Sequence, residues 1–192
     1  PDGETRFSVR EALAHDPDII VIDPRETELA KRAKLWLQVR PGADDALALQ
    51  RLYHWERTAP ERVALTQPVG GGVVRDYTWR EVLDQSRRMA AHLLGLGLQP
   101  GDRIAILSKN TAHWLMSDFA IWLAGCVSVP LFPTLAPGTI RQILEHSEAR
   151  LLFVGKLDIW PHQAPGVPAD LPCIAFPLAP KTEFEAWDAI VS

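Results

Sequence analysis

Three polar residues near the amino end of the chain are of types that bind nucleotides. Asp23, Arg25 and Thr27 directly follow Ile19–Ile22, an apolar, β-branched run that predicts a buried parallel strand. In open α/β sheets, ligands bind at the carboxyl ends of the strands. A carboxylate there can accept hydrogen bonds from ribose hydroxyls, and a guanidinium can bind phosphate. From these residues alone, the alternative that Asp23-Pro24-Arg25 is only a strand-ending turn is favoured.

The segments that follow would position these residues in half of a nucleotide-binding unit. Residues 26–34 have a helical pattern, and residues 35–39 form a second apolar run that predicts a strand. A turn at residues 40–42 comes next, and Asp44 is suited to cap a further helix.

This first segment resembles the dinucleotide-binding domain of molybdopterin oxidoreductases, the nitrate reductase and formate dehydrogenase group. The resemblance rests on VIDPRETELAKRAKLWLQVRPGADDALAL, with departures at Leu29, Lys34 and Ala43. It implies that Asp23, Arg25 and Thr27 approach the guanosine ribose and phosphates of molybdopterin guanine dinucleotide. It also implies that Asp44 pairs with the guanine edge. That family's metal ligand lies outside this sequence.

A second group of candidate residues follows another predicted strand, at residues 103–107. Asn110 lies in the loop after this strand, where it could face a substrate, although a role in helix entry is favoured for this residue type. Thr111 is expected to cap a helix that ends at Leu123. Trp114, on that helix, could line an acyl tunnel together with Phe119 and Trp122, but core packing is the default for such aromatics.

Several other patterns are excluded as sites. Gly70-Gly71-Gly72 lies between two predicted strands, which favours a hairpin over a phosphate loop, because a phosphate loop needs a helix after it. GLGLQP, at residues 95–100, lacks the third glycine of a dinucleotide fingerprint. The six histidines have no metal-ligand spacing.

The alternation of strands and helices predicts an α/β fold. We expect an incomplete, doubly wound, mainly parallel sheet with flanking helices and a β-hairpin near residues 63–77. Strands are predicted at 103–107, 126–131 and 151–154, and helices after Thr78 and over Pro137–His146. Two domains are expected, 1–49 and 50–192, joined within a helix over residues 44–58 and without a flexible linker. The join suggests a chimera formed by recombination, engineering or assembly, in which each part has an incomplete core.

Residues 50–192 resemble the N-terminal subdomain of the adenylate-forming superfamily, and within it the AMP-forming acyl-CoA synthetases. The resemblance rests on residues 77–154, above all YTW, GLQPGDR, Asn110 with Trp114, and GCVSVPL, and the tail from Gly166 suits the connector before that family's phosphate loop. It implies a fragment of an ATP-dependent ligase of fatty acid metabolism, which adenylates a small-molecule carboxylate and then forms a thioester. Two alternatives remain: a fragment of a molybdopterin oxidoreductase, and a non-catalytic module that binds an acyl chain or a partner.

The same resemblance limits what this chain is expected to do by itself. The full-length ligases use ATP, Mg²⁺ and coenzyme A, with a Ser/Thr/Gly-rich phosphate loop, a metal-binding carboxylate and a lysine from a C-terminal domain. None of those motifs occurs here, so we assign no catalytic residue and no metal ligand. We expect no bound cofactor and no adenylation by the chain alone.

Composition sets the remaining expectations. The chain has 192 residues and a formal net charge of -4, which gives no electrostatic support for nucleic-acid binding. Two cysteines form no disulfide framework and favour a cytoplasmic location, with Cys126 as a buried thiol. No transmembrane segment is expected, because prolines and glycines interrupt the charge-free stretch from Phe119 to Ile140. The sequence leaves the oligomeric state open.

Overall fold

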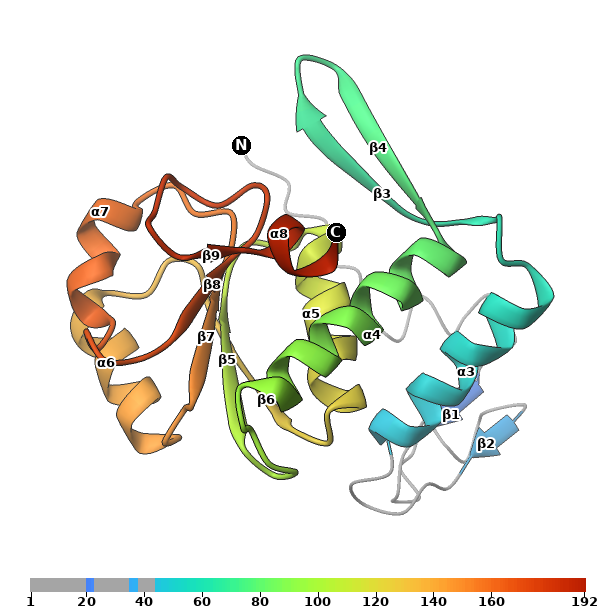
Figure 1. Cartoon of the computed structure of the whole chain (residues 1–192), viewed down its shortest axis with the longest axis horizontal. Helices are drawn as coiled ribbons and strands as arrows, with labels where there is room; N and C mark the ends of the chain where they lie inside the picture. The colour runs from blue at the N-terminus through green and yellow to red at the C-terminus, as the bar shows by residue number, and fades with distance from the viewer. Residues whose placement is uncertain (1–19, 23–34, 38–43) are drawn as a thin grey trace, which may run out of the picture. The chain divides into compact units, whose positions relative to one another are not determined.

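The computed structural model describes residues 20–22, 35–37 and 44–192 of the chain (Figure 1). The chain forms two compact units, Pro1–Leu47 and Ala48–Ser192. In the first unit, β1 (Ile20–Ile22) and β2 (Leu35–Leu37) pair in parallel, with Ile20 opposite Leu35. Both strands were predicted, whereas the helix expected over 26–34 lies outside the described residues.

The second unit is built on a five-stranded parallel sheet (Figure 1). The spatial order of its strands is β6-β5-β7-β8-β9, and every neighbouring pair is parallel. The strands are β5 (Arg103–Leu107), β6 (Val127–Leu131), β7 (Leu151–Val154), β8 (Cys173–Ala175) and β9 (Glu185–Ala186). The predicted bounds of β5 and β7 are confirmed, and β6 begins one residue later than expected.

Helices connect these strands and cover the sheet. They are α3 (Asp44–Thr58), α4 (Trp79–Gly95), α5 (Ala112–Leu123), α6 (Pro137–His146), α7 (Trp160–Gln163), the 3₁₀ turn η1 (Ala164–Gly166) and α8 (Trp187–Val191). Helices follow each of β5, β6 and β7, as parallel pairing requires. This arrangement confirms the predicted α/β class with a parallel sheet and flanking helices.

The helix starts form where their capping residues predict. Thr78 accepts a hydrogen bond from the Glu81 amide at 3.2 Å, and the Glu81 carboxylate accepts one from the Thr78 amide at 2.7 Å. This reciprocal pair is a capping box, which satisfies two amides that the first turn of α4 leaves free. At α5, the Thr111 hydroxyl accepts from the Trp114 amide at 3.1 Å.

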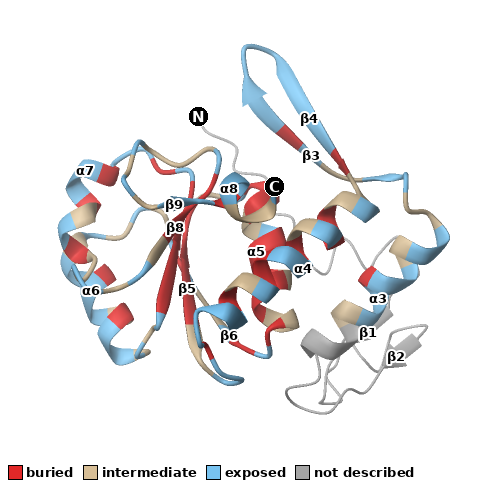
Figure 2. Ribbon diagram, in the orientation of Figure 1, coloured by how far each residue is buried: buried red, intermediate tan, exposed pale blue. Residues whose placement is uncertain are grey.

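The two faces of the sheet bury two separate hydrophobic cores (Figure 2). Alternate residues of a strand point to opposite faces, so Ile104 and Ile106 enter one core while Ala105 and Leu107 enter the other. The first core packs against α4, α5 and α8, and the second packs against α6 and α7. Both faces of the sheet are therefore covered by helices.

The predicted hairpin is present as β3 (Val63–Gly70) and β4 (Val73–Thr78), which pair antiparallel (Figure 1). Gly70, Gly71 and Gly72 all have positive φ, at 105°, 59° and 77°. This left-handed backbone favours glycine, so the triplet is explained by the turn. A strand follows it, which confirms the hairpin interpretation.

The tail of the chain contains structure that the sequence interpretation did not predict. Beyond Gly166, where a connector is expected from the resemblance, the chain forms β8, β9 and α8. Trp187, the first residue of α8, is fully buried in the first core. The periodicity of such short segments is too brief to identify them, and their burial comes from neighbours far away in the sequence.

Candidate functional site

The loops after β5 and β7 form the central part of the sheet's carboxyl edge. The Lys109 amide donates to the Lys156 carbonyl at 2.9 Å, and the Lys156 amide donates to the Ser108 hydroxyl at 3.1 Å. The same hydroxyl donates to the Lys109 carbonyl at 2.6 Å. The side chains of Lys109 and Asp158 form an ion pair across the same two loops. These bonds hold the loop that leads into Asn110.

Gly155 allows this close approach of the two loops. A Cβ atom built on Gly155 would lie 2.5 Å from Cδ2 of Phe176 and would also collide with the Ser108 side chain. The absence of a side chain therefore has a packing reason at this position.

A small cavity lies between the hairpin and the start of α5. Its volume is about 220 Å³, and Asn110 lines it together with residues 65–68, 111, 112 and 115. Gln67, which is buried, accepts a hydrogen bond from the Ala112 amide at 2.8 Å. This bond joins the hairpin to α5 and satisfies an amide that the first turn of the helix leaves free.

Asn110 and Trp114, the two candidates for the substrate side, have different environments. Asn110 is exposed and lines the cavity. Trp114 is half-buried and packs against the first core. The packing alternative is therefore favoured for Trp114, while Asn110 stays available to a ligand.

The first turn of α5 also holds a histidine that the sequence interpretation set aside. His113 is 3% exposed and lies against the rings of Tyr77, Phe176 and Trp187. Burial, together with the nearby Arg75 guanidinium, lowers its pKa from 6.5 to about 4. The imidazole is therefore neutral at pH 7. No spacing motif marks this residue, because its neighbours come from three other elements.

A buried carboxyl group lies further along α5. Asp118 is 9% exposed, and its carboxylate accepts a hydrogen bond from the Ser128 hydroxyl on β6. Burial raises the pKa of Asp118, and the bond from Ser128 opposes part of that rise.

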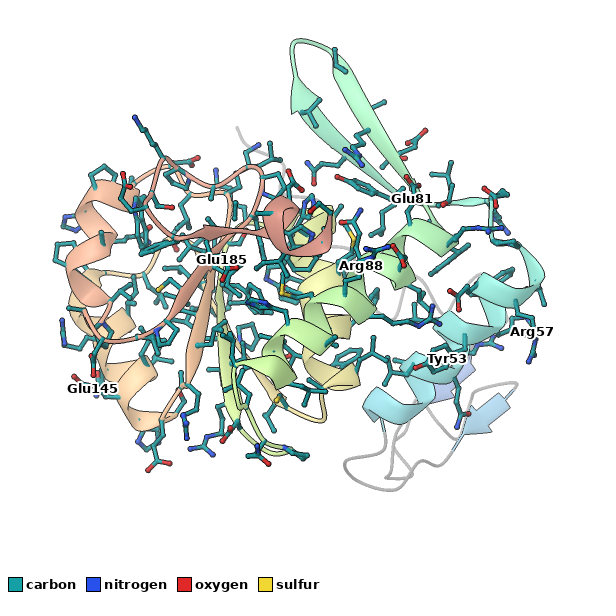
Figure 3. All side chains as sticks on the ribbon, in the orientation of Figure 1. Tyr53, Arg57, Glu81, Arg88, Glu145 and Glu185 are labelled. Carbon is teal, nitrogen blue, oxygen red and sulfur yellow. The ribbon has the colours of Figure 1, made fainter. Side chains whose placement is uncertain are left out.

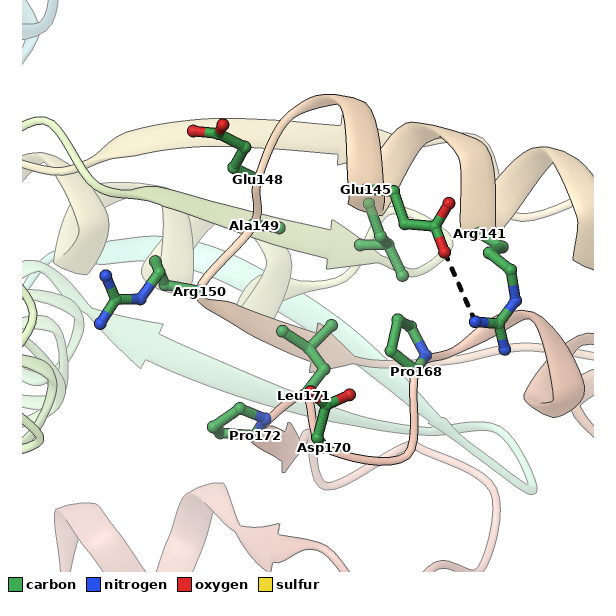
Figure 4. A pocket seen from close by; sticks show the side chains of 10 residues that line it. Arg141, Glu145, Glu148, Ala149, Arg150, Pro168, Asp170, Leu171 and Pro172 are labelled. Carbon is green, nitrogen blue, oxygen red and sulfur yellow. Dashed lines mark ion pairs between the residues drawn. The ribbon is translucent and has the colours of Figure 1, made fainter.

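Another cavity lies at the opposite edge of the sheet (Figure 4). It has a volume of about 460 Å³ and lies beside the residues that precede β7 and β8, including Arg150 and Pro172. Arg141 and Glu145 form an ion pair at its rim, with 3.6 Å between nitrogen and oxygen. It contains none of the predicted site residues, and ligands of open α/β sheets bind at the other edge. We therefore do not assign it as the functional site.

The dinucleotide residues predicted in the first segment are not placed by the structure. Asp23, Arg25 and Thr27 lie outside the described residues. Asp44 begins α3, in agreement with a position at a helix start, and its side chain is not described.

The described residues do not by themselves fit the ligands of the full-length synthetases. Within residues 44–192 and the two short strands before them, no three His, Cys, Asp or Glu side chains gather as a metal site. The glycine triplet forms a hairpin turn rather than a phosphate cradle before a helix. No step that uses ATP or Mg²⁺ is therefore derived from these residues. In the same part of the chain, no helix is both long and apolar enough to cross a membrane.

The parallel sheet, its flanking helices and the hairpin together define the fold of the adenylate-forming enzymes. The chain belongs to the AMP-binding enzyme family, whose pattern matches residues 52–184. The curated relatives and solved structures that it resembles include proteins named as CoA ligases.

Relatives of known name support this assignment. The chain is 38% identical over 112 residues to a long-chain-fatty-acid–CoA ligase, FadD15, of Mycobacterium bovis. That match covers 58% of this chain and 18% of the ligase. A fatty acyl-CoA synthetase A of Dictyostelium discoideum is 26% identical over 161 residues, which cover 77% of this chain and 24% of that protein. The chain thus spans less than a quarter of the length of these two relatives.

Solved structures of ligases share the fold. Acetoacetyl-CoA synthetase from Streptomyces lividans superposes with a TM-score of 0.66 at 20% identity, covering 74% of this chain and 24% of that one. A benzoate CoA ligase from Burkholderia xenovorans gives a TM-score of 0.60 at 21% identity, covering 74% and 27%. The resemblance of residues 50–192 to acyl-CoA synthetases is confirmed. The family match begins at residue 52, so the molybdopterin resemblance of the first segment stays a prediction.

Proposed function

We propose that this chain is the amino-terminal part of an ATP-dependent, AMP-forming acyl-CoA ligase that acts on a fatty acid. The observation that carries the proposal is the 38% identity to a protein named as a long-chain-fatty-acid–CoA ligase, over 112 residues. In such a ligase the carboxylate is first adenylated, and the acyl group then passes to coenzyme A. ATP, Mg²⁺ and coenzyme A would bind with groups from the rest of the longer protein.

In this proposal, the chain itself forms one rigid wall of the site that binds the carboxylate of the fatty acid. Asn110 is the residue best placed to face the substrate, because it is exposed at the carboxyl edge and lines the cavity beside the hairpin. Ser108 and Gly155 fix the loop before it, and Gln67 fixes the turn after it. Trp114 would support this wall from the core rather than contact the acyl chain.

The test begins with a single-molecule read of the source DNA from upstream of Pro1 to beyond Ser192. The protein encoded by the full frame is then assayed for ATP–pyrophosphate exchange with a series of fatty acids. Exchange that depends on a fatty acid supports the proposal. A folded product that shows no exchange with any of these acids contradicts it.

Asn110 is tested in that same product. Asn110→Ala should lower kcat/KM for the acid by about 10-fold, as expected for the loss of one or two polar contacts. Its melting temperature should change little, because the side chain is exposed. Thr139→Ala, at an exposed position of α6, is the matched control and should leave both values unchanged.

We also propose that residues 1–49 form a separate unit, a βαβ fragment of the molybdopterin-oxidoreductase type, joined to the ligase part. The parallel pairing of β1 with β2 and the division of the chain after Leu47 support a separate unit. The continuous helix α3 supports a join without a linker. The same DNA read tests the join, since a break near Leu49 in the source would show that the two parts do not share one gene. A reading frame that continues without a break through this point would show instead that one gene encodes both parts.

We place the protein in the reducing cytoplasm, because Cys126 and Cys173 are free thiols. The non-catalytic alternative, a module that binds an acyl chain or a partner, predicts fatty-acid binding without exchange in the full-frame product. The exchange assay separates these two functions.

A further inference from the structure

One imidazole joins three separate parts of the second unit. His113, on α5, contacts Tyr77 at the end of β4, Phe176 after β8 and Trp187 at the start of α8. The ring centroids lie 5.6, 6.1 and 5.5 Å away, respectively. We call these four residues the aromatic joint. The hairpin and the C-terminal helix α8 are both attached to α5 through it.

The surroundings of His113 in the joint favour the neutral form of its imidazole. Nδ1 of His113 is buried and has no hydrogen-bond partner among the described residues. The guanidinium of Arg75 lies 4.7 Å from the centroid of the Tyr77 ring, so a second positive charge would be close to a protonated His113. A charged imidazole would therefore be buried with an unsatisfied N–H and near a like charge.

The other charged groups around the joint do not neutralise that charge. Burial, together with the carboxylates of Asp188 on α8 and Glu81 at the start of α4, raises the pKa of the Tyr77 hydroxyl. Phe176 has no titratable group. His92 on α4 lies near Glu185 on β9, with 3.3 Å between Nε2 and the carboxylate oxygen.

We propose that the aromatic joint is an acid-sensitive connection, in which protonation of His113 releases α8 and the hairpin from α5. This inference rests on the second unit alone and is independent of the proposed ligase activity. It assigns a conformational role to a histidine that has no metal or catalytic partner among the described residues.

The direction of the pH effect follows from the pKa of His113. That pKa is about 4 in the closed joint and should return to about 6.5 when the ring is exposed to water. The closed joint is therefore fully favoured above pH 6.5, and it is weakened as the pH falls toward 4. The equilibrium constant for opening should rise by about tenfold per pH unit in this window, to a total on the order of 10²-fold.

Hydrogen exchange at two N–H groups can follow the attachment of α8 and that of the hairpin separately. The indole N–H of Trp187 donates to Gln85 on α4 at 3.0 Å, and Trp187 is fully buried, so its exchange with solvent reports on α8. The amide of Ala112 donates to Gln67 of the hairpin, so its exchange reports on the hairpin. The amide of Ile106, inside β5, reports on the core.

The experiment is hydrogen exchange of the whole chain, followed by NMR at pH 7.5, 6 and 5. Each rate is normalised to the free group at the same pH. Protection at Trp187 and Ala112 should fall about tenfold per pH unit below 6.5 and should stay lower than protection at Ile106, which reports on global unfolding and shares the same titration. Equal protection at all three groups would mean that they open only by global unfolding and would overturn the proposal, as would constant protection at Trp187 and Ala112.

The decisive comparison is a variant with an aromatic ring that cannot be protonated. His113→Phe should remove the pH dependence at Trp187 and Ala112, whereas the control His146→Asn, at an exposed position of α6, should retain it. Retention of the pH dependence in His113→Phe contradicts the proposal. If that variant does not fold, the imidazole of His113 is titrated in the wild-type chain. A midpoint well below 6.5 then supports the proposal, and a midpoint near 6.5 refutes it.

Discussion

Gly155 shows how a single residue shapes the carboxyl edge of the sheet. Its backbone lies so close to Ser108 and Phe176 that a methyl group would overlap both. Gly155→Ala should therefore destabilise the protein by about 1–3 kcal/mol, as overpacking of a tight site does. Urea unfolding at pH 7.5 measures this change.

Gly138 is the matched control for that substitution. A Cβ at Gly138, in the first turn of α6, meets nothing within 4 Å. Gly138→Ala should be neutral or should stabilise the protein by up to about 1 kcal/mol, because alanine favours the helix. Equal effects of the two substitutions would mean that close packing at Gly155 is not the cause.

Asp118 gives a prediction with a definite pH dependence. Burial raises its pKa, so the folded protein prefers the protonated carboxyl, and the ionised form destabilises the fold as the pH rises above the unfolded value of 3.8. Asp118→Asn keeps an acceptor for the Ser128 hydroxyl and removes the charge. The variant should be more stable than the wild type at pH 7.5.

That difference should shrink as the pH approaches 3.8, because the wild-type carboxyl is then protonated in the folded protein and increasingly so in the unfolded one. Urea unfolding at pH 7.5 and at pH 4 measures both values. A variant that is less stable than the wild type at pH 7.5 would show instead that the ionised Asp118 is well accommodated.

Among the elements of the second unit, the hairpin is attached through α4 and α5. Figure 1 shows β3 and β4 extending away from the helices, and Val69, Val73 and Val74 are exposed there. An isolated two-stranded hairpin is marginally stable, so its attachment at Gln67 and Tyr77 matters for its position.

Helices α3 and α4 are joined by side chains that both contribute. The ring of Tyr53 on α3, labelled in Figure 3, lies against the guanidinium of Arg87 on α4, with 5.4 Å between the ring centroid and Cζ.

Gln67→Ala should weaken the attachment of the hairpin. The change leaves the amide of Ala112 buried without its acceptor, which destabilises the fold by about 1–3 kcal/mol. Gln142→Ala, at an exposed position of α6, should change stability by less than about 0.5 kcal/mol. Thermal and urea unfolding of both variants compare the two positions, and equal effects would count against the Gln67–Ala112 bond.

For the whole molecule, the chain should not adenylate a fatty acid by itself. Its described residues supply no metal cluster and no phosphate cradle, and stabilisation of the transferring phosphates needs both charge and oriented amides. ATP–pyrophosphate exchange by the purified 192-residue chain should therefore equal the background. Fatty-acid-dependent exchange above background would show that the chain holds a complete site.

The incomplete core expected for residues 50–192 stays a prediction. The sequence interpretation compared residues 50–192 with a larger fold and expected uncovered sheet faces. The tail adds β8, β9 and α8, and Trp187 closes the first core against Phe153 and Phe176. Thermal unfolding of the whole chain is the measurement that decides whether this closure makes the second unit cooperative.

Elements with local signals could be predicted from the residues alone. The capping box at Thr78 and Glu81 and the cap at Thr111 marked two helix starts, and apolar runs marked β5 and β7. The glycine triplet marked a turn, since only glycine adopts its positive φ angles without strain. These features depend on neighbours within a few residues, so periodicity and residue type identify them.

Features that depend on distant neighbours could be identified only from the three-dimensional structure. Gly155 is constrained by residues 108 and 176, and Gln67 bonds to residue 112. The aromatic joint brings His113 together with residues 77, 176 and 187. No local pattern encodes these contacts, because the strand order and the crossovers of the parallel sheet create them. For that reason, Asn110 could be predicted as a candidate site residue from its place after a strand. The buried, neutral environment of His113 could be recognised only in the folded structure.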